Sequence, residues 1–189
     1  MVIGNIDLQE LFALDREEII CQDRIEFKNY PFHHSKAYID KVIHAHEITE
    51  INTFASPPVI KVADELIFVS ANKKEALNQF AKQHDIPVIK RYNLWNLILA
   101  PFLDIQLDEE RHHDIFTRLK EYGVDENIVV EIRNQVADQM MRYNYDAFLW
   151  EKNYFCLMDV LLAMRNSCSN DDFQKFYWKS TQIGMLAYK

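Results

Sequence analysis

The chain has 189 residues, of which 49% are hydrophobic and 13% aromatic. This length suits one domain or two small ones, and the apolar content excludes a disordered chain because it is enough for a buried core. The formal net charge of −8 argues against nucleic-acid binding, since phosphate contacts need clustered Lys and Arg. Only three glycines are present, which is few for the many turns of an all-β sandwich, so helices and short connections are favoured.

Nothing in the sequence predicts secretion or membrane insertion. The first dozen residues lack the basic segment and the apolar run of a signal peptide. The longest apolar stretch, residues 154–164, is interrupted by Asp159 and is about half of the ~20 residues that a bilayer requires. Cys21, Cys156 and Cys168 are widely spaced, which predicts neither a disulfide framework nor a thiolate zinc site. We therefore expect a cytoplasmic protein with reduced thiols.

The first 54 residues contain short elements of mixed type. Residues 6–14 place Leu and Phe on one face and predict a short amphipathic helix. Residues 18–27 alternate between apolar and polar side chains, which is typical of one bulged strand or of two short strands. Residues 28–36, KNYPFHHSK, are expected to form a loop. For residues 38–54 the many β-branched side chains favour a strand over a helix.

Residues 56–87 give the clearest local pattern in the chain. Two apolar, β-branched runs at 59–62 and 66–70 are separated by three residues, which predicts a β-hairpin. A helix should follow, with Asn72 as its N-cap and apolar side chains recurring at helical spacing. Pro87 must end this helix because its backbone has no N–H.

These elements carry a resemblance to a known family over residues 18–86. In order they are a strand in DRIEF, a longer strand ending in HEITEI, the hairpin from PPVIKV to LIFVS, and a helix in NKKEALNQFAKQHDI. The series resembles bacterial pleckstrin-homology-like and GRAM-like domains. The resemblance implies a small curved antiparallel sheet capped by a helix, and a role in binding proteins or lipid headgroups. The corresponding loop, 28–36, holds only two lysines and two histidines, so lipid-headgroup binding is disfavoured.

After Pro87 the alternation gives way to helical periodicity, which places a domain boundary near Arg91. We therefore predict a small α+β domain at residues 1–90 and a bundle of about five helices at residues 91–189. The helix after Asp108 should end at Gly123, which is suited to a C-terminal cap. The predicted helices begin near Leu94, Asp108, Asp125, Asp146 and Asp171, and the fourth is expected to run to Arg165.

Four histidines are the candidate metal ligands. His44 and His46 would point the same way from a strand, because strand side chains repeat every two residues, and two imidazoles so placed can share one divalent ion. His33, His34 or Glu50 would supply further ligands. The same residues also fit a pH-sensitive surface, since imidazole titrates near neutrality, or ordinary half-exposed histidines without a ligand.

Two other features suggest chemistry less strongly. Glu109 and His112, with His113 adjacent, have the ExxH spacing of di-iron carboxylate bundles, but such bundles need this motif twice and only one copy is present. Asp159 interrupts the most apolar segment, so we expect it to face a polar seam or to pair with a basic residue such as Arg165.

The sequence contains no GxSxG, GxxxxGK or GxGxxG motif, so no cofactor is expected and enzymatic activity is left open. The leading hypothesis is a non-enzymatic, cytoplasmic protein-interaction module of bacterial type that binds a protein partner or a second copy of itself. The alternative is a metal-binding protein or metal-dependent enzyme that uses the histidines of the N-terminal half.

Overall fold

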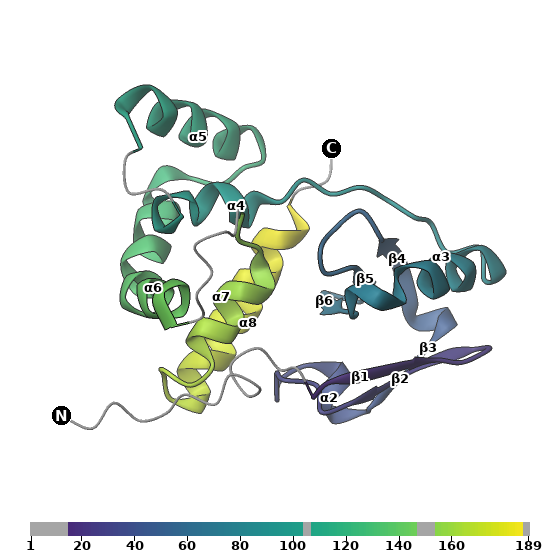
Figure 1. The fold of residues 1–189 in the computed structure, drawn as a ribbon. Helices are drawn as coiled ribbons and strands as arrows, with labels where there is room; N and C mark the ends of the chain where they lie inside the picture. The colour runs from purple at the N-terminus through teal and green to yellow at the C-terminus, as the bar shows by residue number, and fades with distance from the viewer. Residues whose placement is uncertain (1–14, 104–106, 147–153, 187–189) are drawn as a thin grey trace. The chain divides into compact units, whose positions relative to one another are not determined.

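The computed structural model describes residues 15–103, 107–146 and 154–186 of the chain (Figure 1). The fold class is α+β, as predicted. The chain divides into two compact units, Met1–Lys90 and Arg91–Lys189, each of which is described below by itself. The helix predicted at residues 6–14 lies outside the described residues.

The described part of the first unit contains two small antiparallel sheets in place of the single sheet that we expected. The first has the order β1-β2-β3 and the second the order β4-β5-β6. Residues 18–27 form two strands that pair Ile20 with Ile25, and the predicted hairpin pairs Val62 with Glu65. The strands are β1 Glu17–Ile20, β2 Arg24–Lys28, β3 Val42–His44, β4 Ile48–Asn52, β5 Val59–Val62 and β6 Glu65–Phe68.

The prediction of one strand over residues 38–54 is wrong. The segment is divided among the helix α2 (Lys36–Ile39), β3, the 3₁₀ turn η1 (Ala45–Glu47) and β4. Local hydrogen bonds explain the division. Ser35 Oγ accepts the Ala37 N–H at 3.1 Å and starts α2, and the Glu47 carboxylate accepts the His44 N–H at 2.8 Å and turns the chain after β3. Polar side chains that bond to nearby backbone compete in this way with a continuous strand.

A chain of aromatic contacts joins the two sheets. Phe27 on β2 contacts Tyr30, Tyr30 contacts Phe32, and Phe32 contacts Phe68 on β6, with ring centroids 5.6, 5.7 and 6.1 Å apart. The Phe68 N–H also donates to the Tyr30 hydroxyl at 2.9 Å. Burial and the nearby Glu65 carboxylate raise the pKa of Tyr30, so this phenol stays protonated. Tyr30 thereby ties the outer backbone of β6 to the first sheet.

The helix that follows the hairpin is α3 (Lys74–Gln83). It begins two residues later than the predicted Asn72 cap, because residues 71–73 form the 3₁₀ turn η2. Its apolar face is as expected, with Leu77 and Phe80 buried. Beyond the helix, the His84 imidazole bonds to the Gln22 carbonyl at 2.7 Å and so connects the end of α3 to the turn between β1 and β2.

The second unit is helical in its described residues. Figure 1 shows α7 and α8 running side by side, and these two helices are in contact. Asp108 caps α5 by accepting the Arg111 N–H at 2.8 Å, and Gly123 follows the helix with φ 79°, both as predicted. The helices are α4 Leu94–Ile98, the 3₁₀ turn η3 Ala100–Phe102, α5 Glu109–Glu121, α6 Glu126–Asp146, α7 Leu157–Met164 and α8 Asn170–Met185.

The prediction of one helix from Asp146 to Arg165 is wrong. Asp146 is the end of α6, and α7 begins only at Leu157. Cys156 is extended, with φ −131° and ψ 176°, and its N–H donates to the carboxylate of the buried Asp159 at 2.8 Å. Asp159 therefore caps the start of α7, where a carboxylate also interacts favourably with the helix dipole.

Asp159 has a second buried partner. The Tyr143 hydroxyl of α6 donates to its carboxylate at 3.1 Å. Burial and the Asp159 charge raise the pKa of Tyr143, so the phenol keeps the proton that it donates. One carboxylate thus fixes the start of α7 and joins it to α6.

Hydrogen bonds join the short helix α4 to α6 and α8. Arg133 of α6 donates to the carbonyls of Ile98 and Leu97 at 2.8 and 3.2 Å, and its guanidinium lies over the Phe116 ring at 5.1 Å. The indole of Trp95 donates to the Ser180 carbonyl of α8 at 3.2 Å. The two Arg133 bonds satisfy carbonyls at the end of α4, which have no partner within that helix, and the Trp95 bond joins α4 to α8.

We predict that Asp159→Ala destabilises the second unit by about 2–4 kcal/mol, because it removes the carboxylate that accepts from the buried Tyr143 hydroxyl and from the half-buried Cys156 N–H. All three tryptophans of the chain lie within residues 91–189, so denaturant unfolding followed by tryptophan fluorescence reports on this unit. Asp138→Ala, which removes an exposed acid from α6, is the control and should change stability by less than about 0.5 kcal/mol. Equal stability of the two variants would contradict the capping role.

Candidate functional site

The structure brings together two of the four candidate histidines. His44 is the last residue of β3 and His46 lies in η1, so they do not share a strand as predicted. Their rings are nevertheless stacked, with centroids 5.6 Å apart and an interplanar angle of 20°, and both residues are exposed. Turn geometry, which the strand prediction missed, produces this pair.

The other two candidates lie in the segment that precedes α2. The His33 ring contacts the Tyr38 ring, with centroids 4.7 Å apart, and His34 is half-buried. Across the described residues, no group of three or more His, Cys, Asp and Glu side chains lies together as a set that could hold a metal ion. The first unit by itself therefore presents a histidine pair and not a complete metal site.

The ExxH residues of α5 do not form a second centre. Glu109 and His113 are exposed, and His112 is half-buried with its ring 6.4 Å from that of Phe116. Glu131, an acid on the neighbouring helix α6, accepts from Lys179 at 2.8 Å. Glu109, His113 and Glu131 therefore lie on the solvent-exposed sides of α5 and α6.

The helix α2, beside the histidines, is only one turn long and is fixed at its start by buried groups. Ser35 is fully buried and caps it. The Lys36 N–H donates to the carboxylate of Glu65 at 3.0 Å, and Glu65 is itself buried on β6. An isolated helix of this length is not stable in water, so these contacts with the rest of the unit are what hold it.

Lys36 also connects α2 to η1. Its ammonium group lies 2.8 Å from Asp40 and 2.9 Å from Glu47. These two carboxylates raise the pKa of Lys36. The hydrogen bond from the His44 N–H lowers the pKa of Glu47, and the Lys36 ammonium group lowers it further. The turn that carries the histidine pair is therefore coupled to α2 through one ion-paired lysine.

Exposed apolar side chains lie on this anchored helix. Ile39 is 65% exposed and Tyr38 41%, although the backbone beneath them is held in place. We name the exposed residues of this region the α2–η1 surface; they are His33, Tyr38, Ile39, Asp40, Lys41, His44 and His46. Sequence reasoning missed the apolar pair because it assigned Tyr38 and Ile39 to a strand.

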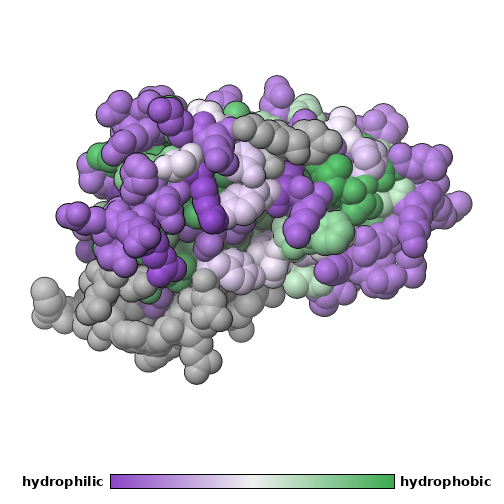
Figure 2. Space-filling view, turned by 90° about the horizontal axis from the view of Figure 1, so that it is seen from above, coloured by the Kyte–Doolittle hydropathy of each residue, from purple (hydrophilic) through white to green (hydrophobic). Residues whose placement is uncertain are grey.

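On the face shown in Figure 2, hydrophilic side chains predominate and apolar residues form small separate patches. Among the described residues of the first unit, Phe54, in the connection between β4 and β5, is 62% exposed, and Val88 is 40% exposed. Asn52 Oδ1 accepts the N–H groups of Phe54 and Ala55 at 3.1 and 3.2 Å, so this turn is also well ordered.

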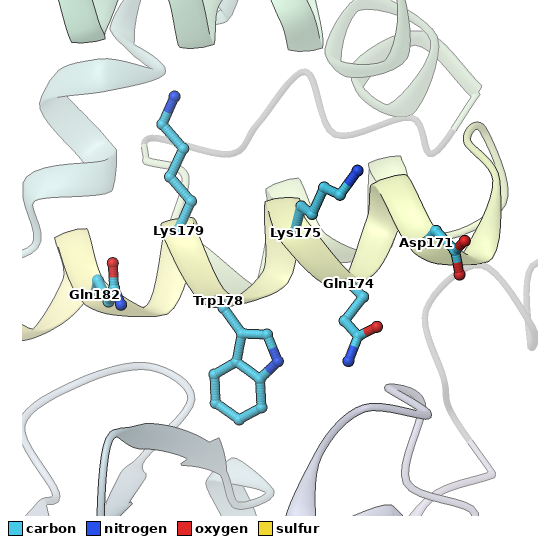
Figure 3. Close-up of a pocket in the computed structure, with 6 residues that line it drawn as sticks. All are labelled: Asp171, Gln174, Lys175, Trp178, Lys179 and Gln182. Carbon is cyan, nitrogen blue, oxygen red and sulfur yellow. The ribbon is translucent and has the colours of Figure 1, made fainter.

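A shallow pocket on the second unit follows the outer face of α8 (Figure 3). In the close-up, Lys175 and Lys179 extend to one side of the helix while Gln174 and Trp178 extend to the other. Lys179 is engaged by Glu131, and the Trp178 ring contacts the Tyr177 ring at 5.3 Å. Since these side chains diverge, they do not form an acid–base pair around one reacting atom.

Comparison of the chain with protein-family models, with curated proteins and with solved structures gives no match. The resemblance of residues 18–86 to pleckstrin-homology-like and GRAM-like domains therefore stays a prediction, as does the helical-bundle arrangement of residues 91–189. None of the helices in the described part of the chain has the length and apolar character needed to cross a bilayer.

We predict that Glu47→Ala loosens the α2–η1 surface, because it removes the acceptor of the His44 N–H and one partner of Lys36. Hydrogen–deuterium exchange of the peptide containing residues 33–48 should accelerate by about 5-fold, equivalent to ~1 kcal/mol. Lys36→Met leaves the Glu47–His44 bond in place and should have a smaller effect. Asp64→Ala, in the exposed turn before β6, is the control and should leave exchange of this peptide unchanged.

Proposed function

We propose that this chain is a protein-interaction module that contacts its partner through the α2–η1 surface. The observation that carries the proposal is the exposed Ile39 on a helix whose start is held by buried Ser35 and Glu65. Fixing the backbone under an exposed apolar side chain adds little to the stability of the unit, because the side chain stays in water. A rigid apolar side chain does favour binding, because less conformational entropy is lost when a partner covers it.

The composition of the surface supports this proposal. Interfaces that form reversibly have an apolar or aromatic centre surrounded by polar residues. Tyr38 and Ile39 supply such a centre, and the flanking residues supply the polar part. The flanking residues are His33, Asp40, Lys41, His44 and His46.

Lipid headgroups fit this surface less well than a protein does. The two lysines of the 28–36 segment are each paired with carboxylates, Lys28 with Glu17 at 3.0 Å and Lys36 with Asp40 and Glu47. A phosphate would have to compete with these acids for each ammonium group. The chain as a whole is also acidic, with a net charge of −8.

The test begins with identification of the partner. A photoreactive phenylalanine analogue at position 39, and separately at position 54, is cross-linked in extract of the native host, and the adducts are identified by mass spectrometry. The partner found only at position 39 is then purified for direct binding measurements with the intact chain. Cross-linking to the same proteins from both positions would contradict a specific surface.

We predict that Ile39→Glu weakens binding of this purified partner at least about 10-fold, since it places a charge at the centre of the interface. Phe54→Glu is the matched control, because it makes the same kind of change at an equally exposed apolar residue of the same unit, and its affinity should equal that of wild type. Both variants should remain folded, since surface substitutions change stability by less than about 0.5 kcal/mol. Equal affinities of Ile39→Glu and wild type would overturn the proposed function.

A further inference from the structure

We infer that the partner at the α2–η1 surface is a second copy of this chain, and that one zinc ion shared by the His44–His46 pairs of two copies joins them. This inference rests on the proposed function, and it identifies the partner as a second copy of the chain and the ligand as zinc. Its first basis is the stacked pair itself, with ring centroids 5.6 Å apart. Both residues are exposed, so a small rotation of each side chain can direct one nitrogen of each ring to a common ion.

The backbone that carries the pair is fixed on both sides. His44 is paired with Arg24 in the sheet, and the Ala45 N–H donates to the Asp23 carbonyl at 2.9 Å. On the other side, the Glu47 carboxylate accepts the His44 N–H and binds Lys36. The backbone positions of the two histidines are therefore set before any ion arrives, which lowers the entropic cost of coordination.

The ligand count calls for a second chain. Zinc in structural sites takes four ligands in tetrahedral geometry, and neutral imidazole nitrogens at about 2.0–2.1 Å are among its preferred donors. In the described residues, no third His, Cys, Asp or Glu joins this pair in a group that could hold a metal ion. Two copies related by a two-fold axis present the same surface to each other and supply two imidazoles each, which completes the set.

The charges around the pair suit a divalent cation. Two basic residues adjoin it, Arg24 opposite His44 and Lys36 bound to Glu47. Four carboxylates surround these two cations, and Lys41, exposed between α2 and β3, is a third cation, so the local net charge of the seven groups is −1. The carboxylates are those of Asp23 and Glu26 at 3.1 and 2.8 Å from Arg24, and those of Asp40 and Glu47 at 2.8 and 2.9 Å from Lys36.

The same charge makes association depend on the metal. Each copy carries −8, so two copies repel each other as they approach. A bound Zn²⁺ between the histidine pairs offsets part of this repulsion at the point of contact. Coordination also brings the α2 helices, with Ile39 and Tyr38, into the region that the two copies share.

The experiment is sedimentation equilibrium of the untagged, full-length chain, first with chelator and then with half an equivalent of zinc chloride. We expect the mass to rise from 22.5 kDa to twice that value, with one zinc bound per two chains by calorimetry and reversal by chelator. His44→Ala and His46→Ala should each lose the shift and weaken zinc binding at least about 10-fold. His113→Ala, which removes a single exposed histidine from α5, is the control and should dimerise like wild type.

A wild-type chain that stays monomeric with zinc, or that binds one zinc per chain, would overturn the inference, as would equal loss in His113→Ala. Circular dichroism of each variant verifies folding, and cobalt in place of zinc gives an absorption spectrum that reports tetrahedral coordination independently of mass. Failure here is distinct from failure of the proposed function, because the histidine variants leave Ile39 in place. If zinc does not dimerise the chain but Ile39→Glu still weakens the cross-linked partner, only the metal inference falls.

Discussion

Irregular backbone inside a protein must find hydrogen-bond partners, and in this chain buried polar side chains provide them. Tyr30 accepts an N–H from the outer backbone of β6, and Asp159 accepts the N–H that precedes α7. Arg133 donates to two carbonyls at the end of α4. The Tyr30 and Arg133 bonds join segments far apart in the sequence, and Asp159, whose bond to Cys156 is local, also accepts from Tyr143 of α6. The packing of sheet on sheet and helix on helix therefore depends on these side chains. These groups stabilise the fold.

At the α2–η1 surface, side chains also bond to backbone N–H groups, but the residues that they hold in place are exposed. Ser35, Glu65 and Glu47 hold a single helical turn and a 3₁₀ turn in place, yet the residues displayed there face water. Elsewhere in the first unit such anchoring accompanies a buried apolar side chain at Phe68 beside Tyr30 and an exposed one at Phe54, whose N–H is bound by Asn52. On α2 the anchored element leaves two neighbouring side chains, Tyr38 and Ile39, exposed, and this pair is what supports the proposed recognition of another protein.

Regular periodicity made much of the fold predictable, and side-chain bonds to the backbone explain where prediction failed. The 59–70 hairpin and the helix between Asp108 and Gly123 follow directly from alternation, capping and a left-handed glycine. The strand expected over residues 38–54 fails because Ser35 and Glu47 bond to local N–H groups, which composition does not reveal. The histidine pair was found for the wrong reason. Strand spacing suggested it, whereas the turn at η1 produces it.

The energies involved explain why the exposed apolar pair and the histidine pair belong together. Burying a large apolar side chain completely contributes about 1.5–3 kcal/mol, and Ile39 and Tyr38 are only partly exposed, so four such side chains across two copies contribute about 3–6 kcal/mol. Association of two proteins costs roughly 4–15 kcal/mol in lost freedom of motion. The apolar contact reaches only the low end of this cost, so in the proposed dimer coordination by four imidazoles would supply the remaining attraction between two acidic chains. The apolar side chains then select the orientation in which the ion can be shared.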